Sequence, residues 1–402
     1  MTSFKHYDLP TLVLYTVISL FGLINIYDVC YDTNSGFYVR QCIWLLVSLL
    51  AFVVMMFIDT RVYYSLAYTS FLITVFLTLL TIFIGRVTRG HSAWIDIGIF
   101  KIQPVEFLKV TCSLAIAKQL DKTRNKMPNS TVGLWIFAIL GLSVGCVILQ
   151  GDLGSTLVFS SFVFVLFIVG FPIITFIYLF VVIVIGILSI FFSLETLFIC
   201  ALCCYVIALI RRKYVKQLLL IVILAVCTLI SAKFVGKVIL KPRHLTRISA
   251  LFNADKDVLG TSWNIMQSKI AIGSGGLLGK GFMRGTQTRY GFIPAQRTDF
   301  IFCTIGEEYG FLGVLIFMGV FLMLLFRLMY LAGRQKDNFS RVYTYCVVSV
   351  LFFHFAVNIS MTIGLFPIIG IPLPFISYGG SALLAFSIMI FIALNLDASR
   401  NE

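Results

Sequence analysis

Charged side chains are scarce in this chain of 402 residues: Asp, Glu, Lys and Arg make up 12% of it, whereas 60% is hydrophobic. A soluble globular protein carries about 25% charged residues, so the composition excludes that class. In lipid every backbone polar group must be hydrogen-bonded within the protein, which only helices and closed barrels achieve. The apolar runs lack the alternation of barrel strands, and at about 20 residues each they predict transmembrane helices.

The glycine-rich run 273–281 lacks the spacing of a nucleotide-binding loop. A P-loop requires GxxxxGK[ST], but Ser274 stands at the first glycine position and Gly281 follows Lys280. The dinucleotide fingerprint fails as well, because Leu278 occupies its third glycine position. We therefore expect these glycines to allow sharp turns and close backbone packing.

The apolar runs predict an all-α polytopic integral membrane protein with about 10–12 transmembrane helices in a single domain, residues 1–402. No cleavable signal precedes the first run, so we expect that run to be a membrane span. Residues 171–210 are interpreted as an extra helical pair. The predicted spans are residues 9–27, 38–58, 65–85, 104–119, 131–150, 153–170, 171–192, 194–210, 217–235, 300–326, 341–362 and 378–395.

Basic residues gather in alternate loops, which the positive-inside rule assigns to the cytoplasm together with both termini. The large loop 233–299 then lies outside, although it holds eleven Lys or Arg against three Asp and so carries +8 of the net +14. One interpretation is solubility or attraction to anionic lipid headgroups. The other is a site for a phosphate-bearing lipid substrate.

Three acids, Glu106, Asp152 and Asp299, fall at the outer ends of predicted spans. Glu106 could simply form an i, i+3 ion pair with Lys109, and Asp152 could be an acid favoured by the dipole at a helix start. Alternatively, a carboxylate beside cations and facing a hydroxyl group could act as a general base.

Two further segments suggest a site on the outer side. Arg243 and Arg247 share a face if their segment is helical, and two guanidiniums suit a diphosphate, although a solvated helix face explains them equally. The stretch 364–384 contains three prolines and cannot be a regular helix. Irregular backbone at membrane depth is tolerated where it is buried or lines a wet cavity, so we expect a cavity there.

The motifs "QSKIAIGSGGLLGKGFMRGTQTRYGFIP", "TDFIFCTIGEEYGFLG" and "GIPLPFISYGGSALL" closely resemble those of the SEDS family, the shape, elongation, division and sporulation proteins. The "GTQ" after the glycine run is similar to the elongation type, RodA, more than to the division type. The resemblance covers residues 9–395.

This resemblance implies a peptidoglycan glycosyltransferase that polymerises lipid II during cell elongation, on the outer face of the bacterial cytoplasmic membrane. It implies as partners a class B penicillin-binding transpeptidase and other membrane proteins of the elongation complex, and no nucleic acid. Two departures stand out. Gly151 replaces a proline, which we expect to loosen that turn, and Arg297 stands where relatives often carry a histidine.

The resemblance also implies the site residues. Asp299, in the T-D-F motif, would be the catalytic base, with inversion and undecaprenyl pyrophosphate as leaving group. No cofactor is certain, and a divalent cation could assist although no ligand cluster demands one. The substrate-binding candidates, partly from the resemblance and partly from their charge, are Trp94, Glu106, Lys109, Asp152, Arg243, Arg247, Lys269 and Arg297.

Two other functions remain open at this point. Broken helices and intramembrane charges fit a flippase that moves a lipid-linked precursor across the membrane. A catalytically inactive scaffold for the transpeptidase is a weaker alternative, because the T-D-F motif is intact.

Overall fold

The computed structural model describes residues 7–31, 36–88, 91–98, 100–122, 130–171 and 261–400. The chain divides into two compact units, Met1–Val165 with Arg247–Glu402, and Leu166–Thr246. The fold and the site are described within the first unit. The predicted helical pair from residue 172 onward and residues 233–260 of the large loop, including Arg243 and Arg247, lie outside the described residues.

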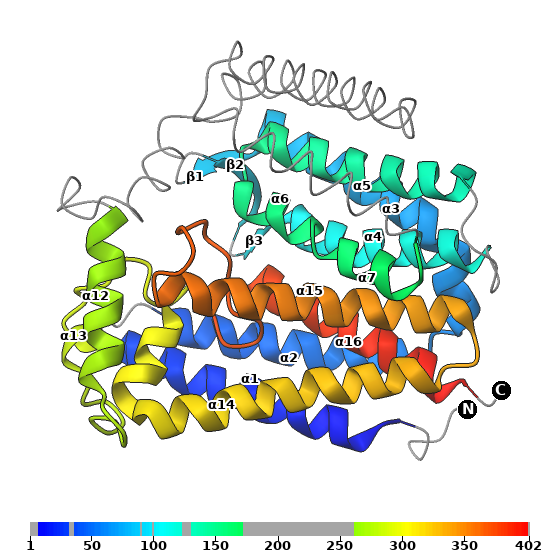
Figure 1. Ribbon diagram of the computed structural model, residues 1–402. Coiled ribbons are helices and arrows are strands. Elements are labelled where there is room, and N and C mark those ends of the chain that lie inside the picture. Colours follow the sequence, from blue (N-terminus) through cyan, green and yellow to red (C-terminus); the bar gives the residue numbers. More distant parts are fainter. Residues whose placement is uncertain are drawn as a thin grey trace, which may run out of the picture. The chain divides into compact units, whose positions relative to one another are not determined.

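Helices dominate this unit, and seven of those described are long and apolar enough to cross a membrane. The prediction of a polytopic helical membrane protein is therefore confirmed. The helices are α1 (Leu9–Cys30), α2 (Phe37–Met56), α3 (Thr60–Ile84), α4 (Pro104–Asp121), α5 (Ser130–Gln150), α6 (Leu153–Phe159), α7 (Phe162–Ile168), α12 (Thr261–Ser274), α13 (Thr286–Arg289), α14 (Ile301–Arg334), α15 (Asn338–Thr362) and α16 (Gly380–Ala398), as seen in Figure 1.

A small antiparallel sheet, which the sequence analysis did not predict, precedes α4. Its strands β1 (Arg86–Thr88), β2 (His91–Ile97) and β3 (Phe100–Ile102) pair in the order β1-β2-β3. The strands are too short and too polar to show a reliable period of two. The sheet brings the chain to Pro104, the first residue of α4.

Aspartates begin four of the helices. Asp8, Asp59, Asp152 and Asp337 each accept a backbone N–H from the first turn of α1, α3, α6 and α15 respectively. A capping carboxylate satisfies donors that would otherwise be left without a partner at the edge of the lipid. Acids at span ends therefore serve helix formation in several places in this chain.

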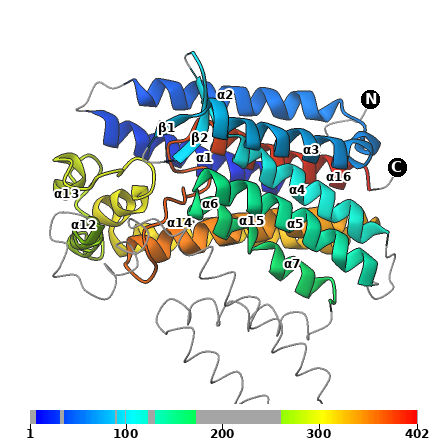
Figure 2. The ribbon, with the colours of Figure 1, turned by 90° about the horizontal axis from the view of Figure 1, so that it is seen from above.

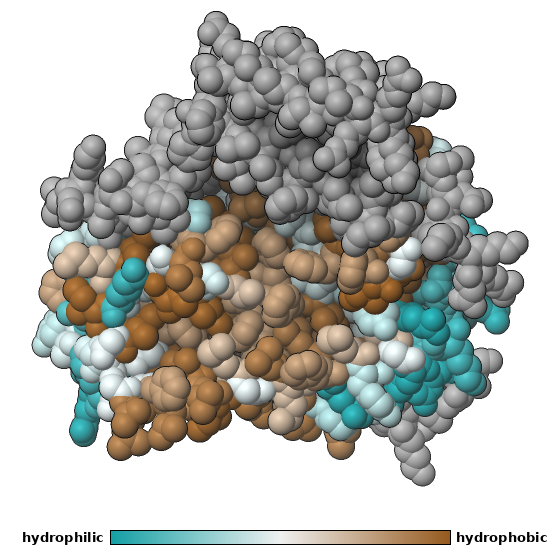
Figure 3. Space-filling model, viewed as in Figure 1, coloured by the Kyte–Doolittle hydropathy of each residue, from teal (hydrophilic) through white to brown (hydrophobic). Residues whose placement is uncertain are grey.

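The helices form a bundle with α4 and α16 inside. α16 packs against α2, α4 and α15, while α14 packs against α1 and α15 (Figures 1 and 2). α1 begins and α16 ends at one end of this bundle, and α12 and α13 lie at the other. In Figure 3, apolar residues cover the middle of the visible face and hydrophilic residues gather toward its two ends, as expected for a surface in contact with lipid.

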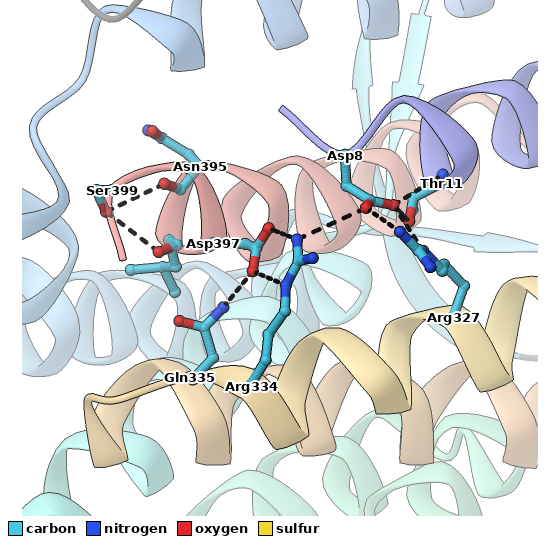
Figure 4. Close-up of polar contacts among 9 residues, drawn as sticks. Asp8, Thr11, Arg327, Arg334, Gln335, Asn395, Asp397 and Ser399 are labelled. Carbon is cyan, nitrogen blue, oxygen red and sulfur yellow. Dashed lines mark hydrogen bonds and ion pairs between the residues drawn. The ribbon is translucent and has the colours of Figure 1, made fainter. Parts of the chain in front are cut away.

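A network of ion pairs joins the start of α1 to the ends of α14 and α16 (Figure 4). Arg327 binds the Asp8 carboxylate through two nitrogens, at 2.6 and 3.0 Å. Arg334 pairs with Asp397 and lies 3.6 Å from Asp8, and Gln335 donates to Asp397 at 3.0 Å. We call these five residues the terminal clamp.

Residues 363–379, between α15 and α16, form no helix and contain Pro367, Pro372 and Pro374. The prediction of a broken segment here is confirmed, and we refer to it as the broken segment. Two glycines let helices approach its backbone closely. A Cβ on Gly22 of α1 would lie 2.4 Å from the Phe375 carbonyl oxygen, and one on Gly154 of α6 would lie 2.5 Å from that of Ile369.

Candidate active site

Asp299 lies in a tight turn two residues before the first residue of α14. Three successive N–H groups, from Thr298 to Phe300, point at the carbonyl oxygen of Ala295. Ala295 itself has a φ of 58°, a left-handed conformation that costs a non-glycine residue about 1–2 kcal/mol. Such backbone strain persists only where the surroundings hold it, and it often marks functional sites. The turn therefore holds Asp299 in a defined place at the mouth of α14.

The broken segment holds this turn from the other side. The amide of Asn358, in α15, donates to the carbonyl oxygens of Asp299 at 2.9 Å and Ile371 at 2.7 Å. The Ser377 hydroxyl donates to the Thr298 carbonyl. A Cβ on Gly370 would lie 3.7 Å from Oδ2 of Asp299, so the carboxylate faces the broken segment. Asp299 is partly exposed, as a group that must reach a substrate requires.

The predicted ion pair between Glu106 and Lys109 is present, with 2.7 Å between Oε2 and Nζ, and both side chains are almost fully buried. The structure adds a third member that the sequence analysis missed. Lys109 Nζ lies 3.0 Å from Nε2 of His354, and His354 Nδ1 lies 3.1 Å from the Pro372 carbonyl oxygen. The buried charges are thus connected to the broken segment, and through it to the Asp299 turn.

Asp152 caps α6. Its carboxylate accepts the N–H of Ser155 at 3.0 Å, the hydroxyl of Ser155 at 2.8 Å and the side-chain amide of Gln103 at 3.1 Å. Asp152 therefore stabilises the start of a helix, as its position in the sequence suggested. The preceding Gly151 has a φ of 78°, which proline cannot adopt. Its N–H and that of Asp152 both bond to the last turn of α5, at 2.8 and 3.3 Å.

The backbone at the "GTQ" motif binds the carboxylate of Glu307. Its buried carboxylate accepts the N–H groups of Thr286, Gln287 and Thr288 at 2.7–2.9 Å, and it pairs with Lys280 at 2.6 Å. The start of α13 thus already holds an internal anion. This agrees with the absence of a phosphate-loop pattern in the glycine run, whose glycines pack closely on α14: a Cβ on Gly275 would lie 2.0 Å from a carbonyl oxygen of that helix.

The remaining candidate residues differ in their surroundings and exposure. The Arg297 guanidinium lies over the Phe37 ring, 4.1 Å from its centroid. The Lys269 side chain is exposed and runs beside Gly364, where the broken segment begins. Trp94 lies on β2, paired with Arg86 of β1. The structure therefore brings Asp299, Arg297 and the Glu106–Lys109 pair to one segment.

His354 and Asn358, which bind the broken segment, could have been noticed as polar positions at i, i+4 in an apolar helix. Metal ligands are a different matter. The described ranges contain no group of three or more His, Cys, Asp or Glu side chains that could hold an ion.

Taken together, the fold and site define a polytopic helical membrane protein with an acid fixed at the start of a membrane helix, beside a segment of irregular backbone that is connected to a buried ion pair. The model of the FtsW, RodA and SpoVE family, described as cell cycle protein, matches residues 7–195 and 193–402. The chain belongs to this family.

Curated relatives extend over nearly the whole chain. The peptidoglycan glycosyltransferase MrdB of Escherichia coli K12 is 29% identical over 398 residues, covering 98% of this chain and 94% of that protein. The peptidoglycan glycosyltransferase RodA of Treponema pallidum is 29% identical over 433 residues, covering 98% of both. A solved structure described as "Structural coordination of polymerization and crosslinking by a peptidoglycan synthase complex" matches with a TM-score of 0.71 and 25% identity, over 98% of this chain and 99% of that one.

Proposed function

We propose that this chain is a peptidoglycan glycosyltransferase that polymerises lipid II into glycan strands, with Asp299 as the general base. Family membership and the names of both curated relatives support the enzyme class. The observation that carries the chemistry is the fixed, partly exposed Asp299 carboxylate at the edge of a buried polar network. A base held in place contributes about 10²–10⁴-fold to proton transfer.

In this mechanism Asp299 removes the proton from the 4-hydroxyl of the N-acetylglucosamine on the incoming lipid II. That oxygen attacks the anomeric carbon at the lipid-linked end of the growing strand, with inversion. The bond to the diphosphate breaks, and its electron pair leaves with undecaprenyl pyrophosphate. The turn at Ala295 and the Asn358 contact keep the carboxylate oriented, which lowers the entropic part of the barrier.

Cations balance the charge of the leaving group. Arg297 and Lys269 lie near the broken segment. Arg243 and Arg247 are further candidates that rest on the sequence alone. Glu106, Lys109, Trp94 and Asp152 remain proposed substrate-binding residues, and we assign no residue to a divalent cation.

The site faces outward from the bacterial cytoplasmic membrane, with both termini in the cytoplasm, because the short basic loops fall on the opposite side. The long basic loop 233–299 does not reverse this orientation, since the positive-inside rule is counted over short loops. A class B penicillin-binding transpeptidase of the elongation complex is the partner we propose. The structural neighbour described as a complex that coordinates polymerization and crosslinking supports this pairing. A cysteine at position 284 should react with an impermeant maleimide from outside intact cells; labelling only after lysis contradicts this orientation.

The test is glycan formation from labelled lipid II, resolved by chain length. Wild type with its cognate transpeptidase is compared with Asp299→Asn and with Asp59→Asn, where asparagine caps the helix nearly as well as aspartate. Long chains from wild type and Asp59→Asn, but none from folded, partner-binding Asp299→Asn, are expected. Equal ladders from all three exclude Asp299 as the base. No ladder from wild type, with lipid II crossing proteoliposome membranes instead, makes the chain a flippase.

A further inference from the structure

Two arginines from distant parts of the chain lie around one aromatic ring. The guanidinium carbon of Arg297 is 4.1 Å from the centroid of Phe37, and that of Arg40 is 5.8 Å from it. Phe37 is the first residue of α2, whereas Arg297 precedes Asp299 by two positions. The sequence analysis did not single out Arg40.

Tyr378, at the end of the broken segment, joins the two arginines. Its ring lies edge-on to Phe37 with 5.0 Å between centroids, and its N–H donates to the Arg297 carbonyl oxygen at 2.8 Å. Its hydroxyl lies within the electrostatic influence of both Arg40 and Arg297. Burial raises the pKa of this phenol, more than the positive charges of Arg40 and Arg297 lower it. At neutral pH the hydroxyl is therefore protonated and can donate to an anion.

The charges of these arginines are not balanced within the described part of the chain. Lys109, Lys280 and Arg327 each pair with a carboxylate. Arg40 and Arg297 form no ion pair with any carboxylate of the described ranges. Two like charges around one ring repel each other, and the free N–H groups at the start of α2 add to the positive potential. An anion between them removes this repulsion.

The other anion-binding position at this end, the start of α13, is already filled by Glu307. We infer that Arg40, Arg297 and Tyr378 form the site that binds the diphosphate of a prenyl-linked ligand. Planar guanidiniums bind phosphate oxygens through two parallel hydrogen bonds each. The inference rests on the proposed function for the prenyl-linked nature of the ligand, and it adds Arg40 and Tyr378 to the binding residues. It assigns the diphosphate to the neighbourhood of Arg297, which precedes Asp299 by two positions in the chain.

The experiment measures binding of farnesyl diphosphate, farnesyl monophosphate and inorganic pyrophosphate to the purified full-length protein in detergent. Arg40→Gln and Arg297→Gln should each weaken farnesyl diphosphate binding about tenfold or more, the effect of losing one charge-assisted contact. Arg40→Lys should restore only part of the affinity, because an ammonium cannot bind two oxygens in a fork. The matched control is Arg284→Gln, an exposed arginine on the glycine-rich segment at the same end.

Binding of inorganic pyrophosphate as tight as that of farnesyl diphosphate would identify a free-diphosphate site and contradict the prenyl-linked ligand. If Arg284→Gln loses as much affinity for farnesyl diphosphate as Arg40→Gln, the binding is due to general surface charge and the proposed site is wrong. Unchanged binding in Arg40→Gln would also contradict the site. The double variant Arg40→Gln/Arg297→Gln should lose less than the product of the single losses if both contact one diphosphate. Glycan synthesis is measured in parallel. If wild type makes strands and Arg40→Gln binds farnesyl diphosphate normally, the binding site is wrong but the proposed function stands. If binding depends on Arg40 but wild type makes no strands, the proposed function is wrong but the binding site stands.

Discussion

His354 connects the buried ion pair to the segment that holds the Asp299 turn, and its two ring nitrogens have distinct partners. Since a charged Lys109 is a donor only, Nε2 must accept, and Nδ1 then carries the proton that it donates to the Pro372 carbonyl. The imidazole is fully buried and stacks edge-on against Phe386, 4.8 Å between ring centroids. The residue therefore holds the broken segment from inside the bundle.

His354→Phe should lower kcat of glycan synthesis about tenfold with little change in KM, because it leaves a buried carbonyl and a buried ammonium each short of one partner. His354→Gln should stay within about threefold of wild type, since a side-chain amide supplies one acceptor and a donor. Steady-state rates with lipid II check both values. Equal activity of His354→Phe and wild type would show that the contact positions nothing of catalytic importance.

Single residues also show where sequence reasoning ends. The Glu106–Lys109 pair was predictable because i, i+3 neighbours on one helix must meet. The partner of Lys109 was not, because His354 lies 245 positions away and only the packing of α15 on α4 brings it there. Asp152 carried the right structural hypothesis from its position before a helix. The separation of Asp299 from its Asn358 partner, 59 positions, likewise hides the contact that fixes it.

At the scale of elements, the lengths of apolar runs located the described helices well, and one difference is explained by charge. The span expected to end at residue 326 continues to Arg334, because Arg327 and Arg334 are paired with Asp8 and Asp397 and so remain tolerable in the helix. The single span expected over 153–170 is two short helices, α6 and α7, separated at residues 160–161. Apolar composition gives no indication of such a break.

Close approach of α1 to the broken segment leads to a test of that element. Gly22→Ala places a methyl group 2.4 Å from the Phe375 carbonyl oxygen, where only a backbone shift can make room. Because the broken segment also holds the Asp299 turn, we expect loss of glycan synthesis together with a destabilisation of about 1–3 kcal/mol.

The matched control is Gly141→Ala in α5, where a new Cβ meets nothing within 4 Å. It should keep full activity and gain about 0.5–1 kcal/mol, since alanine favours the helix over glycine. Thermal unfolding in detergent and the glycan assay are run on both variants. Wild-type behaviour of Gly22→Ala would show that α1 can move away from the broken segment without consequence.

For the molecule as a whole, composition alone decided the class, because 12% charge cannot cover a soluble surface. The placement of the site was partly predictable as well: acids at span ends and irregular backbone at membrane depth pointed to one side of the bundle. What composition and periodicity could not provide is the set of polar contacts between helices distant in sequence. The terminal clamp is the clearest of these, since it joins the start of α1 to α14 through residues 319 positions apart, and α14 to the end of α16 through Arg334 and Asp397.

The terminal clamp predicts how stability depends on pH. Burial tends to raise the pKa of Asp8, but the hydrogen bonds from Arg327 and Thr11 outweigh it and the pKa is lowered. A carboxylate with a lowered pKa in the folded state stabilises that state at pH values above its unfolded pKa, and this stabilisation is lost as pH falls through the folded value. Asp8→Asn should therefore lower the Tm at pH 7, by an amount corresponding to about 1–2 kcal/mol after solvent screening at Arg327.

The difference in Tm between wild type and Asp8→Asn should shrink as the solution is acidified below the ordinary aspartate range, because the wild-type carboxylate is then neutral as well. Asp59→Asn provides the comparison, since Asp59 caps α3 but forms no ion pair with any residue of the described ranges; its Tm difference from wild type should be small. Unfolding curves recorded by tryptophan fluorescence in detergent measure both. A constant deficit for Asp8→Asn at every pH would mean that the ionised carboxylate is unimportant and that Asp8 stabilises the chain ends only through the shape and hydrogen bonds that asparagine lacks.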